Sequence, residues 1–172
     1  AKLELLAKVN KQLNFEPNYM AFARADVLGA KMHQIDLLRE ARVNAMFFGI
    51  ESLTPEVTKL IRKGGKPERM LDSLRNISKE YPEAFTYGNF IIGLSGDSEE
   101  SIKNSTQTVV DEQLLTSAGC NALRIYENLE NPDVKSDIDI DPEKFGYEII
   151  GTDKEWPELG YSSQTWKNDW TT

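Results

Sequence analysis

The feature that most constrains the fold of this chain is an alternation of short apolar runs with segments of helical spacing. The clearest run is residues 45–50, with the sequence AMFFGI, and another apolar stretch lies at residues 87–94. A short run that is apolar at nearly every position is typical of a strand covered on both faces of a sheet. We therefore expect residues 45–50 to form a strand that is buried on both sides.

The same pattern, followed along the chain, predicts the fold class. The expected strands are residues 19–24, 45–50, 87–94 and 122–126, and apolar residues recur at helical spacing between them. A strand that is followed by a helix and then by another strand favours parallel, right-handed βαβ units. About four strands are too few to close a barrel of eight. We expect an α/β fold, namely a partial (β/α) barrel with outer helices that is truncated at its N-terminal side.

Two of the expected helices carry capping signals at their starts. Thr54 precedes Pro55, so that a hydroxyl can accept from the first free amides and proline occupies the first helical position. This helix is expected to end at residues 64–65, where two glycines stand. Asp97, with Glu100 three residues later, resembles a capping box.

The distribution of charge predicts two parts. The formal net charge is -8, yet residues 1–125 carry equal numbers of acidic and basic side chains, so the acidic excess lies entirely after them. We expect residues 1–126 to form the barrel part and residues 127–172 to form an acidic, Trp-containing tail that is mostly irregular. An acidic chain disfavours nucleic acid and anionic lipid as partners. No apolar run approaches the roughly 20 residues of a membrane span, so we expect a cytoplasmic protein.

None of the metal-site patterns in this sequence is complete. The single Cys120 excludes an intrachain disulfide and an all-cysteine metal site, and we expect it to be a small buried residue. The one histidine, His33, has no second histidine to complete a metal site, so a surface position is expected. A calcium-loop spacing that begins at Asp137 has Pro142 where the sharp turn needs glycine.

Polar residues at the ends of the expected strands are the first candidates for chemistry, because ligands of parallel α/β proteins bind beyond the carboxyl ends of the strands. Arg24 ends the first strand, Glu51 the second and Gly93 the third. Glu51 has two interpretations: it accepts hydrogen bonds from a ligand, or it is an ion-paired loop acid. Arg24 is similarly either a cavity residue or part of a structural ion pair, and Gly93 can be a turn residue only.

These residues resemble a known family. The runs FFGIES at 47–52 and FIIGLSGDSEES at 90–101, with RAD at 24–26, are similar to strand ends of the radical SAM (S-adenosylmethionine) superfamily. They look most like the branch that often carries a cobalamin-binding domain, in which GIES and GLPGET recur at this separation. The resemblance covers roughly residues 15–126. Ser95 replaces the usual proline and Asp97 the usual glutamate, and both are mild departures.

The resemblance implies a binding site for SAM. It places a contact to the ribose or amino group of SAM on Glu51, with Ser52 assisting it or capping the next helix. It assigns the adenine-lining backbone to Ile92, Gly93 and Leu94, and it leaves Arg24 as a contact to a carboxylate or substrate.

One departure from the family is severe. The family holds a [4Fe-4S] cluster with a CxxxCxxC loop, and one cysteine cannot supply three thiolate ligands. We therefore expect a missing N-terminal cluster-binding segment as partner and no SAM cleavage by this chain alone. The [4Fe-4S] cluster is expected in the full-length parent enzyme, where cobalamin is a further possible cofactor.

Two other functions stay open at this stage. One is a cluster-free half-barrel that docks a small molecule or a partner without catalysis. The other is an ordinary β/α-barrel lyase or isomerase. The substrate is expected to be a small molecule of unknown identity, and the unpaired edge of strand 19–24 favours an edge-strand dimer.

Overall fold

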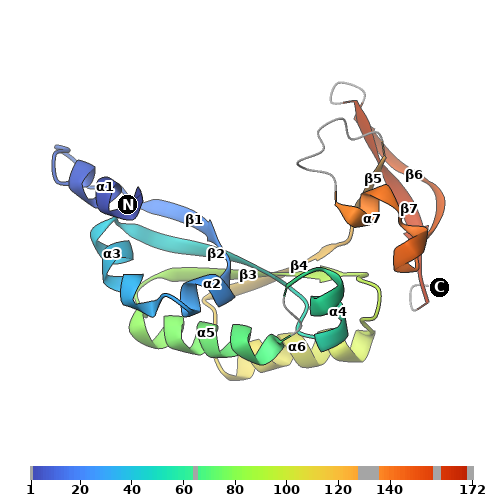
Figure 1. Ribbon diagram of the computed structural model, residues 1–172, viewed down its shortest axis with the longest axis horizontal. Helices are drawn as coiled ribbons and strands as arrows, with labels where there is room; N and C mark the ends of the chain where they lie inside the picture. The colour runs from blue at the N-terminus through green and yellow to red at the C-terminus, as the bar shows by residue number, and fades with distance from the viewer. Residues whose placement is uncertain (1, 64–65, 128–135, 157–159, 170–172) are drawn as a thin grey trace.

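The computed structural model describes residues 2–63, 66–127, 136–156 and 160–169. Its first part alternates helices and strands (Figure 1). The elements of this part are α1 (Lys2–Asn10), β1 (Tyr19–Ala23), α2 (Ala25–Gly29), the 3-10 turn η1 (Met32–Gln34), α3 (Ile35–Glu40), β2 (Val43–Glu51), α4 (Pro55–Leu60), α5 (Pro67–Glu80), β3 (Phe85–Ile92), α6 (Glu99–Asp111) and β4 (Ser117–Ala122). The second part holds β5 (Ile125–Glu127), α7 (Asp137–Ile140), the 3-10 turn η2 (Glu143–Phe145), β6 (Glu148–Trp156) and β7 (Tyr161–Lys167).

The first part is built on one parallel sheet. Its strands lie in the order β1-β2-β3-β4, and each neighbouring pair is parallel. The helices α2, α3, α5 and α6 lie on one side of this sheet (Figure 1). The expected α/β partial barrel with four parallel strands and outer helices is therefore confirmed.

The core lies between this sheet and its helices. Met46, Phe48 and Ile50 alternate along β2 and are at most 1% exposed. They belong to the same cluster of buried residues as Leu74 and Ile77 of α5. Alternation along β2 places its remaining side chains on the opposite face of the sheet.

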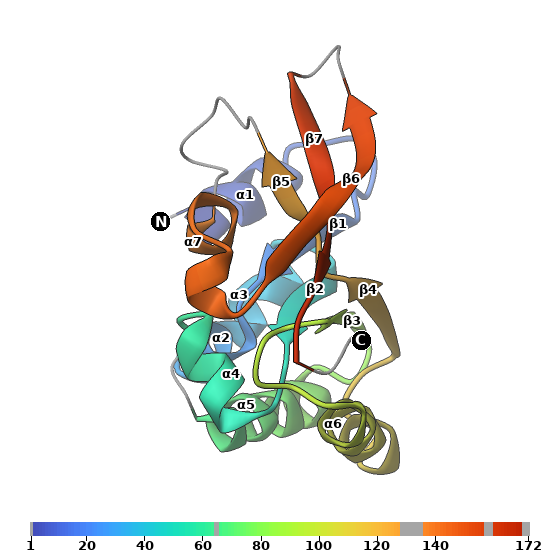
Figure 2. The same cartoon turned by 90° about the vertical axis from the view of Figure 1, so that its right-hand side faces the viewer.

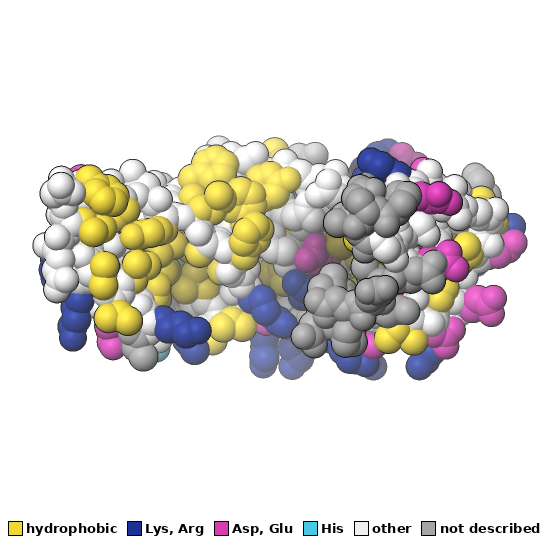
Figure 3. Space-filling model, turned by 90° about the horizontal axis from the view of Figure 1, so that it is seen from above, with side chains coloured by type: hydrophobic (Ala, Val, Ile, Leu, Met, Phe, Trp, Pro, Cys, Tyr) yellow, Lys and Arg dark blue, Asp and Glu magenta, His cyan; other side chains and the backbone are white. Residues whose placement is uncertain are grey.

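That opposite face is only partly covered, because Ala45, Phe47 and Gly49 are half-buried, which corrects the expectation that residues 45–50 are buried on both sides. Phe22 is 88% exposed and Met20 is 60% exposed. Phe22 is paired in register with Phe47, and Phe47 with Tyr87. Their rings form a row with centroid distances of 5.4 Å and 5.0 Å. Apolar side chains gather on this side of the molecule, which faces the viewer in Figure 3.

Two helix boundaries and one helix cap differ from those expected. α4 ends at Leu60 rather than near residues 64–65, which lie outside the described residues. The Thr54 hydroxyl does not cap α4, because it donates to Asp97 instead. α6 is capped by Ser98 rather than by Asp97, and Ser98 forms the capping box with Ser101.

The second part forms a small antiparallel sheet with the order β5-β7-β6. The expected strand at residues 122–126 is wrong, because β4 ends at residue 122 and β5 belongs to this other sheet. The expectation of a mostly irregular tail is also corrected, since residues 148–156 and 161–167 are strands. Figure 2 shows β6 and β7 rising from the end of the parallel sheet, with α7 above α4.

The described residues were also compared with the requirements of a membrane-spanning helix. Among them, no helix combines the length and the apolar character that a membrane span requires.

Candidate functional site

Glu51 ends β2 in an unusual backbone conformation. Its φ angle is 66°, in the left-handed region that residues with side chains rarely adopt. The pairing of β2 with β3 shifts register between Gly49 and Glu51, so a bulge lies at this point. Bulges at strand ends re-aim side chains. Glu51 therefore lies at the carboxyl end of the strand, as the sequence predicts.

The carboxylate of Glu51 is held by groups from two other elements. Lys63, which follows α4, places Nζ 3.4 Å from Glu51 Oε1 and donates to the carbonyl oxygen of Gly49 at 2.9 Å. Asn89 of β3 lies on the other side, with Nδ2 3.5 Å from Glu51 Oε2. Asn121 of β4 donates to Asn89 Oδ1. A polar network thus runs across the ends of β2, β3 and β4.

Gly49 makes room for this arrangement. A Cβ atom built at Gly49 would lie 2.3 Å from Glu51 Oε1. The side chain of Glu51 therefore folds back over the backbone of Gly49, toward Lys63. Any larger residue at position 49 would compete with the carboxylate for the same space.

Ser52 is buried, and its hydroxyl bonds to neighbouring loop residues. It is 3% exposed, its hydroxyl lies 3.2 Å from Asp97 Oδ1, and it accepts from the backbone N–H of Thr54 at 3.0 Å. Asp97 also accepts from Ser101 Oγ at 2.8 Å. Asp97 thus joins the loop after β2 to the loop after β3, and Ser52 belongs to this junction.

The Gly93 turn after β3 is held by the second part of the chain. The Gly93 carbonyl oxygen accepts from Tyr147 Oη at 3.0 Å and from Asn168 Nδ2 at 3.1 Å. Tyr147 Oη accepts in turn from the backbone N–H of Ser95 at 2.7 Å. Tyr147 is 1% exposed, and its burial raises the pKa of the phenol to about 12. It therefore remains a hydrogen-bond donor at neutral pH.

A pocket of about 450 Å³ opens beside Glu51. This volume is within the range of about 300–1,000 Å³ that small-molecule sites occupy. Glu51 and Lys63 provide its charged groups near the strand ends, together with Arg62 and Asp137. Its apolar lining comes from both parts of the chain and consists of Leu60, Ile61, Ile91, Leu94, Leu123, Ile138 and Phe145.

The expected adenine-lining residues have different environments. Leu94 lines the pocket and is 2% exposed, whereas Ile92 is 39% exposed and does not line it. Gly93 is buried beneath the Trp166 ring, which occupies the place where a Cβ would lie. The structure therefore brings Glu51 and Leu94 to the same pocket and leaves Ile92 and Gly93 beside it.

Arg24 forms an ion pair with Asp26. Its Nη2 lies 2.8 Å from Asp26 Oδ2, and its Nε donates to Oδ1 at 3.1 Å. The hydrogen bond from Arg24 lowers the pKa of the Asp26 carboxyl. Arg24 does not line the pocket beside Glu51. The contacts agree with the ion-pair interpretation of this residue.

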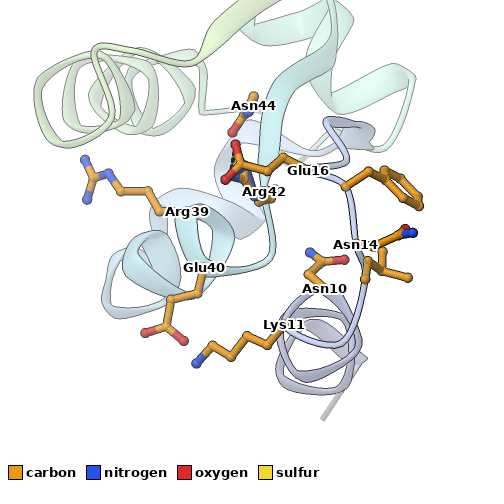
Figure 4. A pocket seen from close by; sticks show the side chains of 10 residues that line it. Asn10, Lys11, Asn14, Glu16, Arg39, Glu40, Arg42 and Asn44 are labelled. Carbon is orange, nitrogen blue, oxygen red and sulfur yellow. Dashed lines mark hydrogen bonds and ion pairs between the residues drawn. The ribbon is translucent and has the colours of Figure 1, made fainter.

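A larger cavity, of about 690 Å³, lies at the opposite end of the strands. Its lining comes mainly from the end of α1, the segment before β1 and the end of α3. In Figure 4, Glu16 reaches across to Arg42, and the two form an ion pair of 2.7 Å. Because ligands of parallel sheets bind at the carboxyl ends of the strands, the pocket beside Glu51 is the better candidate.

Several residues around Glu51 are not identified by any local sequence pattern. The sheet order brings Asn89 and Asn121 to this place, and the segment after α4 brings Lys63. Asn89 did carry a signal, since a polar residue interrupts an otherwise apolar strand. Tyr147, in the predicted irregular tail, carried none.

The single cysteine is exposed, which corrects the expectation that it is buried. It lies on β4 at the edge of the sheet, where nearly all side chains are exposed. His33 is exposed, as expected. In the described part of the chain, no group of three or more His, Cys, Asp and Glu residues is placed to hold a metal ion. The residues of this chain therefore do not fit a three-cysteine [4Fe-4S] site.

Comparison with known proteins identifies the family of this chain. The family model of the radical SAM superfamily matches residues 2–109. The chain belongs to the radical SAM superfamily. An uncharacterized methyltransferase from Pyrococcus horikoshii is 27% identical over 93 residues, which are 54% of this chain and 19% of that protein.

A solved structure shares the fold of this radical SAM chain. It is the radical S-adenosylmethionine methyltransferase TsrM from Kitasatospora setae, with cobalamin and a [4Fe-4S] cluster bound. The TM-score is 0.54 at 17% identity, and the match covers 72% of this chain and 23% of TsrM. The chain thus spans less than a quarter of the length of either protein.

Proposed function

We propose that this chain supplies the SAM-binding and substrate-cavity strands of a cytoplasmic radical SAM enzyme. The observation that carries the proposal is the pocket beside Glu51, whose carboxylate is aimed by a left-handed backbone and held by Lys63 and Asn89. A carboxylate accepts hydrogen bonds from ribose hydroxyls or an ammonium group, and the Lys63 ammonium complements a carboxylate. SAM carries all three groups.

The reductive cleavage of SAM requires a cluster whose ligands this chain lacks. We propose that a CxxxCxxC segment outside these 172 residues provides them. When bound, a [4Fe-4S] cluster supplies the electron for that reaction. Both similar proteins are named methyltransferases, which favours methyl transfer as the reaction of the whole protein, and the cobalamin named for TsrM makes cobalamin the cofactor to test there.

Titration with S-adenosylhomocysteine tests the binding proposal. We expect dissociation constants in the millimolar range, because the cluster that anchors SAM is absent, and we expect Glu51→Gln to weaken binding by about fivefold to tenfold. Glu56→Gln is the matched control, since Glu56 is exposed on α4 a few residues away. Chemical-shift titration by NMR suits this affinity.

Two results would contradict the proposal. Equal affinities of the wild type and Glu51→Gln would show that Glu51 does not contact the ligand. A micromolar heat signal from the chain alone would show that the cluster is not needed as an anchor.

A second candidate is a half-barrel that docks a small molecule or partner without a cluster. The lack of three cysteines in these 172 residues favours it. The coding sequence upstream of Ala1 distinguishes the two candidates. A continuous reading frame that lacks CxxxCxxC would exclude the enzyme and leave the docking module.

A further inference from the structure

The pocket beside Glu51 has walls from two distant parts of the sequence. One wall comes from the parallel sheet and the residues after α4, and includes Ile91 and Leu94. The facing wall comes from the second part of the chain and includes Ile138 and Phe145. The parallel sheet alone therefore leaves this pocket open on one side.

The second part is tied to the sheet next to the pocket. Tyr147 and Asn168, both buried, bind the carbonyl oxygen of Gly93, which precedes the pocket residue Leu94. These hydrogen bonds are intramolecular and shielded from water, so they hold the turn in one place. The position of Leu94 therefore depends on residues more than fifty positions further along the chain.

Trp166 makes a second tie. Its Nε1 donates to the carbonyl oxygen of Leu123, another pocket residue, at 3.1 Å. Its ring packs edge-on against Tyr147, with centroids 5.2 Å apart and an interplanar angle of 81°. On the other side of the pocket, Arg62 and Asp137 form an ion pair of 2.5 Å. This ion pair is largely exposed and contributes little, so the contacts of Tyr147, Asn168 and Trp166 are the ones that hold the facing wall over the pocket.

The pocket is polar at one end and mostly apolar elsewhere. Glu51 and Lys63 lie 3.4 Å apart at the strand ends, while Ile138 and Phe145 provide side chains without charge. A matching ligand has a charged amino-acid end and a flat, weakly polar end. An aromatic ring next to aliphatic side chains favours a planar ring system.

We propose that Ile138 and Phe145 form the base-side wall of the pocket and contact the purine ring of an adenine nucleoside. The assignment rests on the proposed function and adds to it that the second part of the chain, not only the barrel strands, selects the ligand. Glu51 and Lys63 bind the opposite end of the same ligand. The ties through Tyr147, Asn168 and Trp166 make these three residues positioning residues.

The chain offers a matched pair of isoleucines for the test. Ile138 and Ile140 lie on the short helix α7, but Ile138 lines the pocket and Ile140 is 64% exposed. Ile138→Ala is expected to weaken the binding of adenosine and of S-adenosylhomocysteine by about fivefold to tenfold, because apolar contact with the base is lost. Ile140→Ala is expected to leave both affinities unchanged, and L-methionine should bind all three proteins equally.

A second measurement uses the unaltered chain. In the complex with adenosine, nuclear Overhauser effects are expected between the purine protons and the ring protons of Phe145. This measurement needs no variant, so it does not depend on how well a variant folds. The Trp166 indole N–H resonance reports whether the wall is still docked in each variant.

The outcomes separate the two proposals. If S-adenosylhomocysteine binds in a Glu51-dependent way but neither Ile138→Ala nor the Phe145 signals respond to adenosine, the base-side wall is wrong and the proposed function stands. If the wild type binds neither S-adenosylhomocysteine nor adenosine, both proposals fail.

Discussion

Glu51 combines conformational strain with a position at the candidate site. Its left-handed backbone costs on the order of 1–2 kcal/mol for a residue with a side chain. Strained conformations of this kind persist where the surroundings hold them, and they gather at functional sites. Here Lys63 and Asn89 hold the carboxylate, and Gly49 leaves it the space.

Gly49→Ala tests this arrangement. The added methyl group would meet Glu51 Oε1, so we expect the carboxylate to move away from Lys63 and ligand affinity to fall by about as much as in Glu51→Gln. Stability should change little, because the clash is with the end of a flexible side chain. Gly151→Ala is the control, since a Cβ there meets nothing within 4 Å. Unchanged affinity in Gly49→Ala would argue against the placement of Glu51.

Tyr147 is expected to make the free energy of unfolding depend on pH. Its folded-state pKa of about 12 exceeds the value of about 10 expected in the unfolded chain. The unfolded chain loses this proton first, so the contribution is present below pH 10 and is lost as pH rises toward 12. We expect up to about 2–3 kcal/mol of stability to disappear over this window.

Urea unfolding at pH 8 and pH 11.5 measures this loss. Tyr147→Phe serves as the comparison, because it removes the ionisable group and keeps the ring. A loss of the same size in both proteins would assign the effect to other groups.

Asp97 joins the loop after β2 to the loop after β3. Its Oδ1 accepts from Ser52, Thr54 and Ser101, so one carboxylate connects the starts of α4 and α6. The resemblance to a capping box was real but shifted by one residue, because Ser98 is the N-cap. A carboxylate can serve either as a cap or as a junction, and only the fold decides.

Two variants at neighbouring positions separate the cap from the junction. Ser98→Ala should cost about 1 kcal/mol, which is typical of a lost N-cap. Asp97→Ala should cost about 3 kcal/mol, because three buried or half-buried hydroxyls lose their acceptor. Chemical denaturation of both variants measures the free energies of unfolding. Equal costs would mean that Asp97 does not join the loops.

The whole molecule exposes an apolar strand at the edge of its parallel sheet. β1 occupies this edge, and Phe22 and Met20 are exposed on it. Exposed apolar edges favour pairing with another chain. The edge-strand dimer expected from the sequence therefore remains a proposal with a clear structural basis.

Sedimentation velocity tests this proposal over a range of concentrations. The wild type is expected to self-associate, and Phe22→Lys to be mainly monomeric, because charge on an edge strand opposes pairing. Ile150→Lys places the same charge on β6, where Ile150 is 56% exposed, and should leave association unchanged. A monomeric wild type would exclude the dimer.

The sequence by itself determined that the first three strands form, their parallel arrangement and the position of Glu51 at a strand end. These depend on local signals, since apolar runs, prolines and glycines act within a few residues. β4 was misplaced because its sequence, SAGCNA, has no apolar run and its side chains are nearly all exposed. The antiparallel sheet was missed because β7, YSSQTWK, is largely polar.

Tertiary structure alone decided which residues share the site. Asn89 meets Glu51 because β3 lies beside β2, and Asn121 reaches Asn89 because β4 lies beside β3. Lys63 reaches Glu51 from the segment after α4, and Tyr147 reaches Gly93 across 54 positions of sequence. No local pattern encodes such contacts, because each hydrogen bond depends on where the backbone carries two distant side chains. The sequence fixes the chemistry available at each position, and the packing of the elements selects which groups come within bonding distance.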